Sequence, residues 1–229
     1  MSEPVLHRIL AFDCSGGACS AAVWSDGAIR AERMAVMERG HAEALMPQIR
    51  DVMAEAGLDF TALDALATTV GPGSFTGLRL GLAAAKGLAL ATDLPIMAFS
   101  GFEAVLAGIP AERRSGRPVA VAIDSRRGPV FAQLFTAEGR AAAPPEAVEP
   151  NNFEAWLPPG PILVSGDGTP GLAAPARADI EISAVPSRIS AAALARQAAS
   201  LGRAGLGRLP VAPLYLRPPD VTLPKQAAS

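Results

Sequence analysis

Two segments of the chain share one pattern of apolar and polar positions. Residues 9–24 and 119–135 each read as an apolar strand ending in aspartate, a small polar turn, and a second apolar strand. A glycine follows four residues after the aspartate, Asp13 or Asp124, in both segments. Strands that are apolar at nearly every position are buried on both faces, as in a sheet covered by helices. The repeated pattern therefore predicts an α/β protein with two related lobes.

A polar run at residues 113–118 separates the two halves. Such runs are typical of connections between compact units, so we expect an N-terminal lobe at residues 1–110 and a smaller C-terminal lobe at residues 111–229. The C-terminal lobe should include an alanine-rich helix at residues 190–201. After Arg217 the chain has three prolines and no hydrophobic period, and we expect this tail to be disordered.

The N-terminal lobe contains a helical stripe between His41 and Ala56. Apolar residues recur there at helical spacing, namely at Leu45, Ile49, Val52 and Met53. Pro47 lies inside this stretch. Because proline cannot donate the helical hydrogen bond, we expect it to kink the helix or to limit the regular part to the residues beyond it.

A second helix, at residues 76–90, follows a short strand and the turn Gly71-Pro72-Gly73. Ser74 or Thr76 can cap its N-terminus. Small residues recur at every fourth position of this helix, at Gly77, Gly81 and Ala85. A face of nearly bare backbone allows another helix to approach closely.

Composition limits the possible partners. The 229 residues carry a formal charge of −2, and lysine and arginine are scattered along the chain. Proteins that bind nucleic acid without a partner usually present a basic face, so we do not expect this chain to bind RNA directly. No apolar segment is long enough for a membrane span, and the N-terminus lacks a signal-peptide core. We therefore expect a cytoplasmic protein that does not bind membranes.

The sequence gives little support for a metal site or for peptidase activity. The two cysteines, Cys14 and Cys19, and two histidines fall short of a standard zinc pattern, and we expect both cysteines to be small buried residues. The chain contains neither a Gly-x-Ser-x-Gly elbow nor a His-Glu-x-x-His motif. Peptidase activity is therefore not expected.

Several motifs, in order, resemble those of the TsaB family, also called YeaZ. They are Asp13-x-Ser15, His41-x-x-x-Leu45-x-Pro47, the run GPGSFTGLR at residues 71–79, Asp124-x-Arg126-Arg127-Gly128, Gly166-Asp167-Gly168 and Tyr215-Leu216-Arg217. The resemblance covers residues 9–217. It implies the actin/Hsp70/sugar-kinase fold with two ribonuclease-H-like lobes, which agrees with the repeated hairpins.

The resemblance also implies a function. TsaB proteins take part in forming N6-threonylcarbamoyladenosine in tRNAs that read codons beginning with A. They act as partners of the transferase TsaD and the ATPase TsaE, and pair with a second TsaB copy when TsaD is absent. We therefore expect a non-catalytic assembly subunit that meets tRNA only through the complex.

The two helices of the N-terminal lobe are the expected interface. We assign to it His41, Leu45, Ile49, Val52, Met53, Gly73, Phe75, Thr76, Gly77, Leu78, Gly81, Leu82 and Ala85. On this hypothesis Gly81→Leu leaves the fold intact but abolishes partner binding. The alternative is that both stripes simply cover the sheet of their own lobe.

A nucleotide cleft is a second hypothesis. Asp13, Ser15 and Asp124 stand where ATPases of this fold place phosphate and Mg²⁺ contacts, so ATP or ADP with Mg²⁺ is a possible ligand shared with a partner. A small-molecule kinase or ATPase is the alternative function. Otherwise, the aspartates stabilise their turns through hydrogen bonds to the backbone. His41 and Leu45 occupy the places of the two metal-binding histidines of TsaD, so no catalytic metal is expected.

Overall fold

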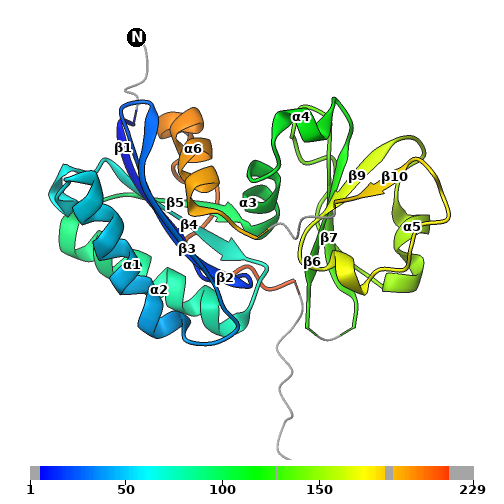
Figure 1. Ribbon diagram of the computed structural model, residues 1–229, viewed down its shortest axis with the longest axis horizontal. Coiled ribbons are helices and arrows are strands. Elements are labelled where there is room, and N and C mark those ends of the chain that lie inside the picture. Colours follow the sequence, from blue (N-terminus) through cyan, green and yellow to red (C-terminus); the bar gives the residue numbers. More distant parts are fainter. Residues whose placement is uncertain (1–5, 127, 184–187, 217–229) are drawn as a thin grey trace, which may run out of the picture.

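The computed structural model describes residues 6–126, 128–183 and 188–216, which form two lobes (Figure 1). Each lobe is built on a five-stranded sheet. The first has the order β3-β2-β1-β4-β5, with β1 (Arg8–Asp13), β2 (Ala18–Ser25), β3 (Ala28–Val36), β4 (Ala65–Gly71) and β5 (Ile96–Ser100). The second has the order β10-β9-β6-β7-β8, with β6 (Val119–Asp124), β7 (Val130–Phe135), β8 (Glu146–Val148), β9 (Ile162–Ser165) and β10 (Ile180–Ile182).

The two sheets have the same topology. β1 is antiparallel to β2 and parallel to β4, and β6 is likewise antiparallel to β7 and parallel to β9. Each central strand ends at its aspartate, Asp13 or Asp124. The predicted duplication of the hairpins is therefore confirmed.

Helices cover both faces of the first sheet (Figure 1). They are α1 (His41–Ala56) and α2 (Phe75–Thr92) on one face, and α3 (Gly101–Ala107) and α6 (Ala191–Leu201) on the other. Side chains alternate along β1: Leu10 and Phe12 pack in the cluster with α1 and α2, while Ile9 packs in the cluster with α3 and α6. This two-sided burial explains why the strand is apolar throughout.

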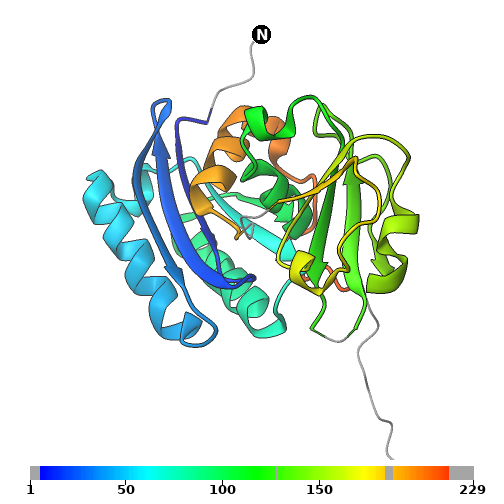
Figure 2. The same cartoon turned by 45° about the vertical axis from the view of Figure 1, so that its right-hand side comes forward.

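Helix α6 corrects the predicted division of the chain. It lies in the C-terminal half of the sequence, yet it packs on β1 and β2 of the first sheet, between that sheet and the second lobe (Figure 2). Its side chains Leu194 and Ala198 share a core cluster with Ile9. The strands of the first sheet lie between Arg8 and Ser100 and those of the second between Val119 and Ile182, whereas α6 packs on the first sheet.

The ends of the helices follow the local sequence. The Ser74 hydroxyl oxygen accepts a hydrogen bond from the Gly77 amide at 3.2 Å and caps α2. A full capping box joins Ser100 and Glu103 at the start of α3. The short helices α4 (Ala111–Arg114) and α5 (Phe153–Trp156) belong to the connection and to the second lobe.

Pro47 does not interrupt α1, which runs from His41 to Ala56. The expectation that the regular helix begins beyond Pro47 was therefore wrong. Because Pro47 and Glu43 both lie on the exposed side of α1, the carbonyl group of Glu43, left without its helical partner, is open to water.

The end of the described chain packs against the first lobe. Leu209, Val211 and Leu214 lie over Leu78 and Leu82 of α2. The tail that we expected to be disordered, after Arg217, lies outside the described residues. Among the residues that are described, no helix is both long enough and apolar enough to cross a bilayer.

Candidate functional site

The turn after β1 is held together by the carboxylate of Asp13. Asp13 is only 1% exposed. It accepts hydrogen bonds from the Ser15 amide at 3.0 Å, from the Ser15 hydroxyl at 2.8 Å, and from the hydroxyl of Thr69 on β4. Burial raises the pKa of Asp13, and the hydrogen bonds from Thr69 and Ser15 partly oppose this rise. The contacts match the hypothesis in which Asp13 stabilises its turn.

The corresponding turn after β6 is more open. Asp124 accepts a hydrogen bond from the Arg126 amide at 2.7 Å, and its own amide donates to Asp167 Oδ1 at 3.0 Å. The Arg126 side chain lies 3.5 Å from Asp124 and 4.0 Å from Asp167. Arg126 has a φ of 64°, a conformation uncommon outside glycine. Burial raises the pKa of Asp167.

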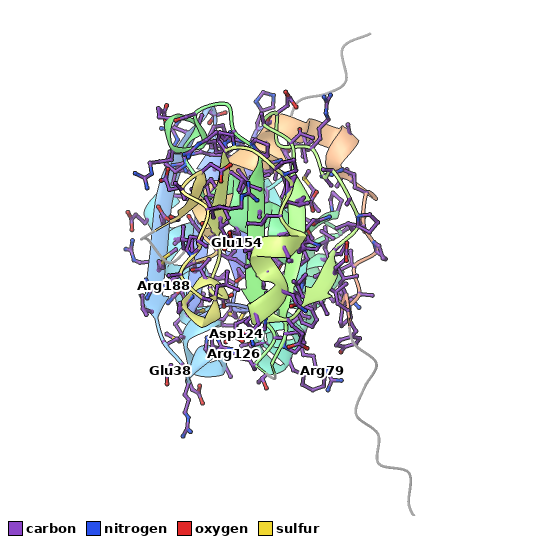
Figure 3. The ribbon with its side chains drawn as sticks, turned by 90° about the vertical axis from the view of Figure 1, so that its right-hand side faces the viewer. Glu38, Arg79, Asp124, Arg126, Glu154 and Arg188 are labelled. Carbon is purple, nitrogen blue, oxygen red and sulfur yellow. The ribbon has the colours of Figure 1, made fainter. Side chains whose placement is uncertain are left out.

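A cleft of about 490 Å³ lies between the two turns. It is lined by Ser15, Gly16 and Gly17 from the first turn and by Asp124, Arg126 and Asp167 from the second. Glu38 and Arg188 complete its charged lining, on the other side of the Asp124–Arg126 pair from Arg79 in the view of Figure 3. The charged side chains are thus three carboxylates and two guanidinium groups.

This cleft does not fit a Mg²⁺–phosphate site that uses both aspartates. Asp13 is absent from the residues that line the cleft, and its oxygens already accept three internal hydrogen bonds. Asp124 is engaged with Arg126. Of the proposed nucleotide contacts, Ser15 and Asp124 reach the cleft and Asp13 does not.

The predicted interface stripe of α1 faces inward. Leu45, Ile49, Val52 and Met53 are all buried, and they pack against the first sheet in one cluster with Leu10. His41, the first residue of α1, is half-buried, and its Nε2 has no hydrogen-bond partner among the described residues. No three histidine, cysteine, aspartate or glutamate side chains in the described part of the chain gather as a metal site.

The small-residue face of α2 also packs inside the lobe. Gly77, Leu78, Gly81, Leu82 and Ala85 are buried, and Gly81 faces the side chain of Thr68 on β4, with 3.6 Å between an added Cβ and Thr68 Oγ1. The close approach predicted for this face occurs with the chain's own sheet. Consequently, Gly81→Leu would disturb the fold, and it cannot serve as a test of partner binding.

Other residues form the outer surface of these helices. We define the outer face as Met46 of α1 together with Phe75, Thr76, Ala83, Gly87 and Leu90 of α2, all exposed. Leu90 is 90% exposed and Met46 is 39% exposed. Of the predicted interface residues, Phe75 and Thr76 lie on this face, while Gly73 lines the cleft.

Several residues of these two surfaces were not predicted from the sequence. They are Glu38, Arg126, Asp167 and Arg188 in the cleft, and Met46, Ala83, Gly87 and Leu90 on the outer face. A signal for α2 was present. Leu78 and Leu82 lie beside Gly77 and Gly81 on the helix, and such large apolar side chains mark the side that packs on a sheet.

The cysteines lie close together at the base of the first turn. Cys14 and Cys19 are buried and free, with their sulfur atoms 3.2 Å apart. Both pack in the cluster beneath α1 and α2, which confirms the prediction that they are small buried residues.

The chain is similar to known proteins of tRNA threonylcarbamoyladenosine formation. Residues 34–204 match the family model of TsaD, tRNA N6-adenosine threonylcarbamoyltransferase. The tRNA threonylcarbamoyladenosine biosynthesis protein TsaB of Escherichia coli is 40% identical over 125 residues, which are 54% of this chain and 53% of that protein. The chain thus matches about half the length of this curated relative.

Longer matches cover nearly the whole chain. A protein of Mycobacterium tuberculosis is 31% identical over 225 residues, which are 96% of each chain. The solved structure of YeaZ from Pseudomonas aeruginosa superposes with a TM-score of 0.76 at 30% identity, over 92% of this chain and 100% of that one. These matches show that the chain belongs to the TsaB, or YeaZ, family, which shares the TsaD family model.

Proposed function

We propose that this chain is a non-catalytic assembly subunit for the formation of N6-threonylcarbamoyladenosine in tRNA. It acts as the partner of a TsaD-like transferase and a TsaE-like ATPase, and meets tRNA through the assembled complex. The names of the curated relatives support the pathway. The internal hydrogen bonds of Asp13, which does not line the cleft, support a role without catalysis.

The observation that carries the proposal is the outer face of α2. Gly87 lies in the middle of this helix, is exposed, and has open space where a Cβ would stand. Glycine inside a helix costs about 1 kcal/mol relative to alanine, and no contact within the lobe requires glycine at this position. A partner helix that packs closely on this face gives the glycine a function.

The apolar neighbours of Gly87 support the same surface. Leu90 lies one turn further along α2, and Ala83 lies one turn before. Residues three or four apart share one face of a helix. Ala83, Gly87 and Leu90 thus form an exposed face of small and apolar residues, and Met46 is exposed on helix α1, which contacts α2. Burial of such apolar surface against a partner helix is favourable.

The test is complex formation with the TsaD-like subunit from the same genome. Gly87→Leu adds bulk on the open side of α2, so we expect an unchanged fold and a loss of binding of at least tenfold. Gly171→Leu is a matched control, because Gly171 also has open space at its Cβ position but lies in the second lobe. Unimpaired binding by a folded Gly87→Leu variant would contradict the proposed interface.

A further inference from the structure

The N-terminal end of α2 carries an exposed cluster of two aromatic rings and an arginine. We call Phe75, Arg79 and Tyr215 the aromatic platform. The Arg79 Cζ atom lies 3.6 Å from the centre of the Phe75 ring, and the Phe75 and Tyr215 rings are 6.2 Å apart. Phe75 is 56% exposed and Tyr215 is 51% exposed. Aromatic residues and arginine are enriched at protein interfaces relative to the rest of the surface.

The platform is held in place from both sides. Phe75 directly follows Ser74, whose side chain caps α2. Tyr215 directly follows Leu214, whose amide donates a hydrogen bond to the Val70 carbonyl oxygen at 2.6 Å. The two rings therefore come from segments 140 residues apart, and each is fixed by its anchored neighbour while its side chain stays exposed.

Arg79 has hydrogen-bonding capacity that no other described residue uses. No carboxylate among the described residues forms an ion pair with it, as is also true of other exposed arginines such as Arg50 and Arg203. Its position over the Phe75 ring distinguishes Arg79 from them. Stacking on Phe75 restricts the guanidinium group. A restricted, unpaired guanidinium group is well suited to a carboxylate, which it binds through two parallel hydrogen bonds.

We infer that the aromatic platform docks a protein segment that presents a carboxylate beside an apolar side chain. The carboxylate pairs with Arg79, and the apolar side chain packs on the rings of Phe75 and Tyr215. This inference rests on the proposed function, since the segment belongs to the TsaD-like partner. At the N-terminal end of α2, the partner would then be recognised by an ion pair as well as by the fit of apolar surfaces. Arg79 and Tyr215 become specificity-determining residues.

The charge of the platform favours a protein over an RNA as its binding partner. Arg79 is its single cation, and the whole chain has a formal charge of −2. RNA binding draws its affinity from several phosphate contacts at once. Interface hot spots, in contrast, are enriched in tyrosine and arginine.

The experiment measures the affinity of the full chain for the purified TsaD-like subunit by calorimetry. Because ion pairs in a desolvated hot spot contribute strongly, Arg79→Ala should raise the Kd at least about tenfold. Arg79→Lys keeps the charge but loses the two-pronged geometry, so its Kd should lie between those of the wild type and Arg79→Ala. Tyr215→Ala should also raise the Kd at least about tenfold.

Arg196→Ala is the matched control. Arg196 is an exposed arginine on α6, on the opposite face of the first sheet from α2, and its loss should change the Kd by less than about twofold. Circular dichroism verifies that each variant is folded. If folded Arg79→Ala and Tyr215→Ala bind as tightly as the wild type, the platform inference is wrong while the proposed function stands.

Two further results would also overturn the inference. If Arg79→Ala leaves transferase binding unchanged but weakens tRNA binding by the isolated chain, the platform is an RNA contact. If it changes only self-association, measured by sedimentation, the occupant is a second copy of this chain. Failure of the wild-type chain to bind the transferase at all contradicts the proposed function itself, a result distinct from failure of the variants alone.

Discussion

At Gly77, the backbone of α2 lies directly against the Cys14 carbonyl group at the end of β1. An ideal Cβ at Gly77 would stand 1.9 Å from the Cys14 oxygen. A neighbouring backbone contact is also short, because the Ser74 amide donates a hydrogen bond to the Ser15 carbonyl oxygen at 2.6 Å. The glycine-rich start of α2 thus seats the helix on the first turn of its own lobe.

Gly77→Ala should therefore lower the free energy of unfolding by about 2 kcal/mol or more, because the methyl group meets backbone that cannot move aside cheaply. Urea denaturation followed by circular dichroism measures this change. An unchanged denaturation midpoint would show that α2 does not lie as close to β1 as described.

Gly87→Ala should have the opposite effect on the isolated chain. Gly87 has open space at its Cβ position, and replacing an exposed helical glycine with alanine raises the free energy of unfolding by about 0.5–1 kcal/mol. The same denaturation experiment serves as the measurement. A destabilised Gly87→Ala variant would mean that this position is not on the open side of α2.

Two adjacent threonines on β4 offer a contrasting pair. Thr68 Oγ1 is buried with no hydrogen-bond partner among the described residues, while the Thr69 hydroxyl donates to Asp13. Thr68→Val should leave the free energy of unfolding unchanged or raise it by about 1 kcal/mol, because it removes an unpaired buried hydroxyl. Thr69→Val should lower it by about 1–3 kcal/mol. Equal effects of the two substitutions would contradict these assignments.

The raised pKa of Asp13 predicts a pH dependence of stability. Burial favours the protonated carboxyl group in the folded state. Between the ordinary pKa of about 4 and the raised folded value, the unfolded chain binds fewer protons, so stability falls as the pH rises. Asp13→Asn removes this dependence.

The free energy of unfolding of Asp13→Asn, minus that of the wild type, should therefore increase as the pH rises above about 4. Asp167 also has a raised pKa, but it is present in both proteins and cancels in the difference. Urea unfolding at a series of pH values gives the measurement. A difference that stays flat with pH would show that Asp13 has the same pKa in both states.

Much of the fold could be predicted from the sequence because the signals are local. The apolar runs of β1 and β6 and the caps at Ser74 and Ser100 depend on neighbouring residues alone. The orientation of α2 was harder to predict from the sequence, because small residues occur on both faces of the helix, at Gly81 and at Gly87. Their roles differ only in what lies opposite them.

Contacts between distant segments could not be predicted. The pairing of Phe75 with Tyr215 joins residues at the start of α2 and near the end of the described chain. The packing of α6 on the first sheet likewise depends on the path of the chain around the second lobe. Such contacts follow from tertiary structure, and no periodicity along the sequence reports them.

The most direct test of the account is tRNA modification in a purified system of the TsaD-like transferase, the TsaE-like ATPase and the synthase that supplies threonylcarbamoyl-adenylate. N6-threonylcarbamoyladenosine is measured with the wild-type chain, without it, and with folded Gly87→Leu or Asp124→Ala variants. The account predicts that modification requires the chain, is lost with Gly87→Leu and is retained with Asp124→Ala. Modification that proceeds equally without the chain, or that survives Gly87→Leu but not Asp124→Ala, would contradict it.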